Sequence, residues 1–167
     1  MTNKQFEQLS KAEKRVAIAK DVLKLIKAEK LIPETGSYVE NDQLDSILWN
    51  NDEVDIKKAL KELQQPCEVC ALGAIFYAET IKRNDCVIVG RFVRRDDITK
   101  RMKDIFTKGQ MIMIESAFES GDFNELRIVS QGNIELSINF GSQYTEPKER
   151  LVAIMENIVK NKGTFKP

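Results

Sequence analysis

The sequence contains no histidine, and this absence excludes more chemistry than any other feature of its composition. Without histidine, the chain has no side chain that ordinarily titrates near neutral pH, and it lacks the commonest metal ligand. Mechanisms that pair serine or cysteine with histidine are excluded for the same reason. The motifs of P-loop, dinucleotide-binding and serine-hydrolase enzymes are also missing. The composition therefore favours a binding protein, and a small hydrolase or transferase is left open as an alternative.

The sequence also lacks long apolar runs and an excess of either charge. Its longest apolar run is about ten residues, too short to cross a bilayer, and the first residues have no apolar signal core. The 167 residues include 26 lysines and arginines and 26 aspartates and glutamates. With zero net charge, no overall field attracts nucleic acid or an anionic membrane. We therefore predict one cytoplasmic domain over 1–167, with neither a membrane nor nucleic acid as its partner.

Cysteine is scarce, and the number of cysteines is odd. Cys67, Cys70 and Cys86 leave one thiol unpaired in any disulfide scheme, which favours a reducing compartment. Three thiolates and a neighbouring carboxylate could hold zinc, but structural zinc sites normally use four cysteine or histidine ligands. A redox pair of the thioredoxin type needs its motif after a strand, and a helix is expected here. We interpret the cysteines as small apolar core residues and predict no metal and no cofactor.

A stretch without charge indicates the centre of the fold. No residue from Val69 to Ala78 is charged, and apolar residues occupy every side of the helix that this stretch would form. Such a helix is normally surrounded by its neighbours, and Gly73 would let another backbone approach it closely. We predict a buried helix over residues 69–83.

Helical periodicity is present on both sides of this stretch. Ser10 and Glu13 have the spacing of a capping box, and an apolar stripe follows them. The capping box and the stripe predict a helix over 11–29. Further helices are expected over 44–49, 56–63, 98–106, 111–119 and 145–160.

One segment has the period of a strand instead. Ile134, Leu136, Ile138 and Phe140 alternate with polar residues, which predicts a hairpin whose first strand lies near 126–128. The expected fold class is therefore mainly α (α+β): a single globular domain of about six helices around the buried helix, with a small C-terminal β-hairpin.

A basic stretch at 82–108 provides the candidate binding site. It has nine cations and four acids. Free amides at a helix start, together with adjacent guanidinium groups, can bind phosphate, although Asp96 and Asp97 lie where the anion would dock. A solvated charged face is the simpler interpretation. The candidate ligand-binding residues are Arg91, Arg94, Arg95, Lys100 and Arg101.

An acidic stretch precedes the buried helix. Residues 33–56 include seven acids and no lysine or arginine. This segment lacks the spacing of a calcium-binding loop, and its charge is too local to imitate a nucleic-acid backbone. It is either a solvated loop region or, within residues 34–55, a face that inhibits a protein partner.

Several segments are similar to a known group of proteins. The residues that carry the similarity are Arg15–Val22, Gly36–Val39, Cys67–Ala74, Ile114–Glu119, Ile154–Ile158 and Asn161–Pro167. Together they resemble a family of small uncharacterised proteins encoded by tailed bacteriophages, for which no catalytic residue is assigned. The resemblance implies a phage accessory protein in an infected bacterium that binds a host or defence protein, or sequesters a nucleotide signal.

From these observations we expect a non-enzymatic phage protein that binds a host-side or defence target. The preferred ligand is a phosphate-bearing nucleotide at the basic stretch. The alternative is a protein–protein inhibitor that uses the acidic face, and pairing with a second copy of the chain is left open.

Overall fold

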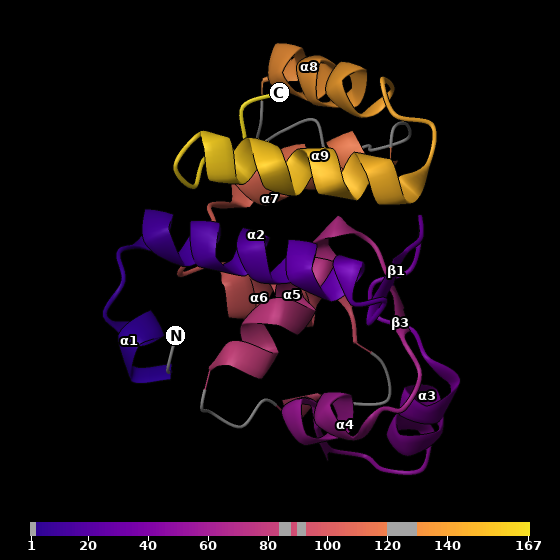
Figure 1. The fold of residues 1–167 in the computed structure, drawn as a ribbon. Helices are drawn as coiled ribbons and strands as arrows, with labels where there is room; N and C mark the ends of the chain where they lie inside the picture. The colour runs from indigo at the N-terminus through magenta and orange to yellow at the C-terminus, as the bar shows by residue number, and fades with distance from the viewer. Residues whose placement is uncertain (1–2, 84–87, 90–92, 120–129) are drawn as a thin grey trace.

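The structure is a computed structural model, and it describes residues 3–83, 88–89, 93–119 and 130–167. Helices dominate these ranges (Figure 1). The helices are α1 (Asn3–Glu7), α2 (Lys11–Lys27), α3 (Asp42–Trp49), α4 (Ile56–Glu62), α5 (Ala71–Lys82), α6 (Arg95–Met102), α7 (Lys108–Glu119), α8 (Gln131–Gly141) and α9 (Pro147–Lys160). The strands are β1 (Leu31–Pro33), β2 (Val54–Asp55), β3 (Cys67–Val69) and β4 (Ile88–Val89).

Helix α5 lies in the hydrophobic core, as the uncharged stretch predicted. Every residue from Ala71 to Thr80 is buried, including Glu79, which is fully buried despite its charge. At Gly73, a Cβ atom would overlap the backbone carbonyl of Tyr38. Glycine is therefore required at this position, because the turn at 36–38 packs directly on the helix.

Helix α2 lies between α5 and α9 and contacts both of them (Figure 1). The capping box expected at its start is present: the Glu13 amide donates to the Ser10 hydroxyl at 3.3 Å, and the Glu13 carboxylate accepts from the Ser10 amide at 2.9 Å. These bonds satisfy amides that the first helical turn leaves without partners.

Two short strand pairs connect the helices. Strands β1 and β3 are parallel, with Leu31 beside Cys67, and β2 and β4 are antiparallel, with Val54 beside Val89. The first pair brings the chain after α2 next to the chain entering α5. It therefore fixes the N-terminal end of the buried helix.

The expected C-terminal hairpin is wrong, and so is the expected number of about six helices. Residues 131–141 form α8, and nine helices occur within the described ranges; the hairpin's first arm, near 126–128, lies outside them.

The alternating apolar residues also contain a helical pair, Ile134 and Ile138, four positions apart. Ser137 and Gly141 complete the inward face, where a Cβ on Gly141 would overlap the carbonyl of Ala117 on α7. Small residues thus let α8 approach α7 closely, a signal that period counting misses.

In the described part of the chain, every helix falls short of the length and hydropathy that crossing a membrane requires.

Candidate functional site: a lysine-rimmed groove beside helix α2

The basic stretch supplies helix α6, and the start of this helix is already occupied by a carboxylate. The backbone N–H of Arg94 donates to the Asp97 carboxylate at 2.9 Å. Asp97 therefore places a negative charge at this helix start, where it disfavours a phosphate. Arg91 lies outside the described residues.

Arg95 points to a buried carboxylate on α7. Its Nη2 lies 2.8 Å and its Nε 3.2 Å from Oε2 of Glu115, which is 2% exposed. The hydroxyl of Tyr38 donates to the other carboxylate oxygen at 3.2 Å. Because a buried carboxylate needs a partner, the primary role of Arg95 in this fold is to neutralise Glu115.

Arg101 makes the corresponding contact with Glu79 on α5. Its Nε lies 2.7 Å from Oε2 of Glu79, and Nη1 of Arg83 lies 3.0 Å from Oε1. Burial nevertheless raises the pKa of Glu79 above its ordinary value, and the two arginines oppose that rise. Two of the expected binding residues therefore support the core, while Arg94 and Lys100 are exposed.

The cysteine pair has the surroundings of core residues. Cys67 and Cys70 are buried free thiols, and burial raises the pKa of each to about 12. A thiol with such a pKa is poorly reactive. The described residues contain no cluster of three or more metal-ligating side chains; Cys86 lies outside these residues.

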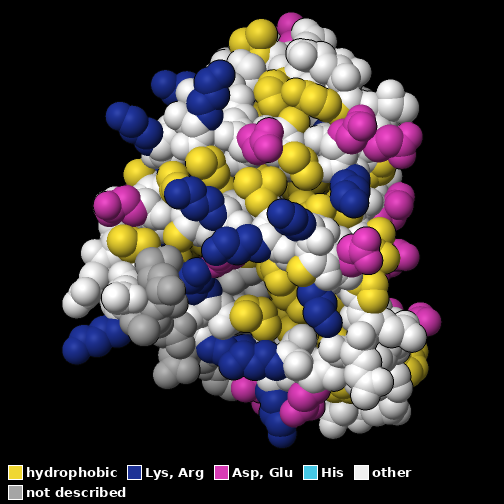
Figure 2. All heavy atoms as spheres, in the orientation of Figure 1, with side chains coloured by type: hydrophobic (Ala, Val, Ile, Leu, Met, Phe, Trp, Pro, Cys, Tyr) yellow, Lys and Arg dark blue, Asp and Glu magenta, His cyan; other side chains and the backbone are white. Residues whose placement is uncertain are grey.

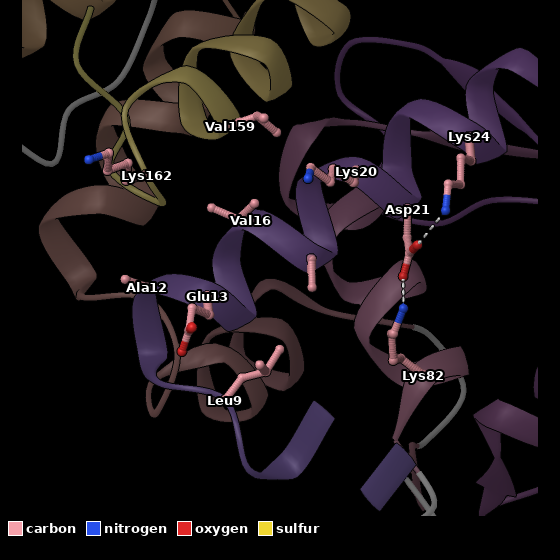
Figure 3. Close-up of a pocket in the computed structure, with 11 residues that line it drawn as sticks. Leu9, Ala12, Glu13, Val16, Lys20, Asp21, Lys24, Lys82, Val159 and Lys162 are labelled. Carbon is pink, nitrogen blue, oxygen red and sulfur yellow. Dashed lines mark hydrogen bonds and ion pairs between the residues drawn. The ribbon is translucent and has the colours of Figure 1, made fainter. Parts of the chain in front are cut away.

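A different part of the surface combines apolar and cationic groups in one concavity. This lysine groove has a volume of about 650 Å³ and runs beside α2 (Figure 3). Its lining comprises Leu9, Ala12, Glu13, Val16, Ala17, Lys20, Asp21, Lys24, Lys82, Val159 and Lys162. In the space-filling view, lysine and arginine side chains surround hydrophobic atoms over the middle of the molecule, with few acidic side chains among them (Figure 2).

The acids of the lysine groove already have partners. Asp21 forms an ion pair with Lys82 and lies 3.8 Å from the amine of Lys24 (Figure 3). Glu13 is held in the capping box by Ser10. The carboxylates of the groove are therefore committed to side chains of the protein itself.

Two lysines of the groove have no such partner. Lys20 and Lys162 are exposed, and within the described part of the chain neither forms an ion pair. Val16 lies between them in the close-up, with Val159 on the opposite wall (Figure 3). The site thus presents two uncompensated cations beside a small apolar surface.

Lys162 is held close to α2 by the turn that ends α9. Lys162 and Gly163 both have positive φ, 52° and 91°, and the Gly163 amide donates to the carbonyl of Ile158 at 2.8 Å. Arg15 on α2 donates to the carbonyls of Gly163 and Ile105. A Cβ on Gly163 would overlap the carbonyl of Ala12, so glycine permits this contact and fixes the lysine beside the groove.

Sequence reasoning did not find this groove. Lys20 and Lys24 resemble ordinary solvated residues of an amphipathic helix. Lys162 directly follows α9, more than 130 residues further along the chain. Only the packing of α2 against α9 brings these side chains together. None of the protein-family models, curated proteins or solved structures compared with this chain matches it.

Proposed function

We propose that this protein binds a small phosphate-bearing nucleotide in the lysine groove and does not convert it. The observation that carries the proposal is the pair of exposed lysines, Lys20 and Lys162, on either side of Val16. These amines are free to contact an anion, whereas the expected arginines Arg95 and Arg101 are paired with buried carboxylates. The groove therefore replaces the basic stretch as the preferred site.

The size and the mixed lining of the groove favour a nucleotide. Ligand sites usually measure about 300–1,000 Å³ and combine apolar walls with a few polar groups, and this groove has about 650 Å³. Val16, Ala17 and Val159 offer an apolar surface for a base, and the lysines offer point charges for phosphate oxygens. An inorganic anion would use the amines and leave the apolar wall without a contact.

The polar groups of the groove support binding rather than catalysis. Asp21 is ion-paired and Glu13 is part of a helix cap, so neither carboxylate is available as a general base. In the setting that the bacteriophage resemblance implies, such a protein would sequester a nucleotide signal of an infected or defending cell.

A thermal-shift screen against ATP, cyclic AMP and cyclic di-GMP tests the proposal, because a ligand of the folded state raises the melting temperature. The test variant is Lys20→Ala/Lys162→Ala. The matched control is Arg94→Ala/Lys100→Ala, which removes the same charge from exposed positions on the basic stretch. We expect the shift to disappear in the first and persist in the second. A flat screen, or loss of the shift only in the control, would overturn the proposal.

A second candidate function is inhibition of a protein partner through the acidic segment 34–55. It is supported by exposed apolar residues at and beside these acids. Trp49 is 62% exposed and Ile32 is 44% exposed, and Ile32 shares a pocket with Glu40, Asp42 and Asp45. A basic protein could be held there by apolar contact and opposite charge. In that case Trp49→Ala would weaken partner binding, and Lys20→Ala/Lys162→Ala would leave it unchanged.

A further inference from the structure

Four lysines line the lysine groove, and the carboxylate of Asp21 divides them into two pairs (Figure 3). Asp21 lies on α2 and forms an ion pair with Lys82, the last residue of α5, and it also lies 3.8 Å from the amine of Lys24. Lys20 and Lys162 are the two groove lysines that form no ion pair in the ranges that the structure describes. The Asp21 carboxylate therefore determines how many of the four cations a ligand can meet without competition.

Lys82 depends on the Asp21 carboxylate more than Lys24 does. The side chain of Lys82 is 14% exposed, whereas that of Lys24 is 79% exposed. An ammonium group that is largely shielded from water needs a partner, and among the described residues Asp21 is the acid that pairs with Lys82. A phosphate oxygen in the groove would therefore reach Lys82 only in competition with Asp21.

We propose that Asp21 is a specificity-determining residue of the lysine groove and that the groove gains affinity from no more than two phosphate charges. This inference rests on the nucleotide binding proposed above. The lining has four lysines and two acids, so its formal charge is +2 with both acids ionised. A third or fourth phosphate charge would meet the Asp21 carboxylate, and this repulsion offsets the attraction of Lys24 and Lys82. The groove thus binds a nucleoside monophosphate about as tightly as the triphosphate.

Cyclic AMP, AMP, ADP and ATP share the adenosine and differ in phosphate charge, so this series tests the role of Asp21. Isothermal titration calorimetry without divalent cations measures the affinity of each. In the wild type, we expect the affinity to rise from cyclic AMP to AMP and to stay level from AMP to ATP. In Asp21→Asn, Lys82 and Lys24 lose their carboxylate, and ATP should bind roughly tenfold more tightly than in the wild type, because hydrogen bonds to charged groups have about that value. The affinity for cyclic AMP should change by less than about threefold, since Lys20 and Lys162 already meet its single charge.

Two further variants separate the release of Lys82 from a general change in charge. Glu13→Gln removes the same charge from the groove lining and keeps the helix cap, because glutamine also fits a capping box. It releases no lysine, so the relative affinities for AMP and ATP should stay as in the wild type. In Asp21→Asn/Lys82→Ala, the gain for ATP should disappear. Thermal unfolding without ligand verifies that each variant is folded.

The outcomes distinguish this inference from the proposed function. A gain for ATP that is confined to Asp21→Asn and lost with Lys82 would support the inference. Three results would overturn the role of Asp21 and leave the proposed function in place: an affinity that rises steadily from AMP to ATP in the wild type, no selective gain for ATP in Asp21→Asn, or an equal gain in Glu13→Gln. Absence of nucleotide binding by both the wild type and Asp21→Asn would overturn both proposals.

Discussion

Arg101 and Lys20 are both cationic side chains on amphipathic helices, but their surroundings differ. The side chain of Arg101 is 14% exposed and contacts a carboxylate that is fully buried, whereas Lys20 is exposed at the rim of a groove. A buried carboxylate without a partner is costly, so Arg101 is required by the fold. Lys20 stabilises nothing comparable, and its charge is available to a ligand. Cations that are alike in the sequence therefore divide into structural and accessible groups according to the carboxylates that the fold places near them.

The largest expected effect comes from breaking the buried pair of Arg101 and Glu79. Removing one partner of a buried ion pair typically costs about 3–5 kcal/mol. Arg83 also contacts Glu79, so Arg101→Ala should fall near the lower end of that range in urea unfolding. Lys100→Ala, one position earlier and exposed, should change the free energy of unfolding by less than about 0.5 kcal/mol. Equal losses of stability in the two variants would contradict the division of the cations into structural and accessible groups.

Arg95→Ala should destabilise the protein less, because Tyr38 remains as a donor to Glu115. Hydrogen bonds to charged groups contribute about 1.5–3 kcal/mol, and we expect a loss in this range. A double-mutant cycle with Glu115→Gln measures the coupling, because Arg95→Ala should cost less where the carboxylate is already neutral. Additive losses would show that Arg95 acts independently of Glu115.

Glu119 differs from Glu79 and Glu115, because its recorded hydrogen bond comes from a backbone amide and not from an arginine. It is partly buried and accepts a hydrogen bond from the Gly36 amide at 3.1 Å. Burial raises its pKa above the ordinary value, and the nearby Glu115 adds to the rise. The folded state thus holds this proton more tightly than the unfolded state. Its contribution to stability is present at low pH and is lost as pH rises from about 4.5 through the raised pKa.

Unfolding of the wild type and of Glu119→Gln at several pH values measures this effect. The stability of the wild type relative to the variant should decline as the pH rises above about 4.5. A relative stability that is constant, or that increases with pH, would contradict the assignment.

The smallest effect on stability is expected for the groove lysines. Lys20→Ala and Lys162→Ala remove exposed side chains without an ion-pair partner in the described part of the chain, so each should change the free energy of unfolding by less than about 0.5 kcal/mol. Chemical denaturation measures this directly. A loss of several times that amount would mean that these lysines are structural as well.

The sequence predicted the parts of the fold that depend on local patterns. The Ser10–Glu13 capping box and the buried helix both follow from residues close together in the chain, and both are present. The sequence did not predict helix α8, because four alternating apolar residues satisfy a strand pattern. The close packing of Gly141 on Ala117 of α7 is consistent only with the helix. Such a contact between separate segments leaves no periodic signal.

The site was harder to predict for the same reason. Arg95 and Arg101 were selected because cations cluster in the sequence, but the carboxylates that pair with them come from α7 and α5. Lys162 was overlooked because its position beside α2 depends on the turn at Gly163. A cluster of charges in a sequence shows which residues are charged, and only the packing shows which charges remain available.

The most direct test of this account is to locate a bound nucleotide by methyl NMR spectroscopy, with ATP titrated into the wild-type protein. Val16 and Val159 report on the lysine groove, and the buried Ile98 reports on α6. The account predicts that the methyl signals of both valines shift with increasing ATP and that those of Ile98 stay in place. Shifts of Ile98 without shifts of the valines would return the site to the basic stretch and contradict the division between structural and accessible cations.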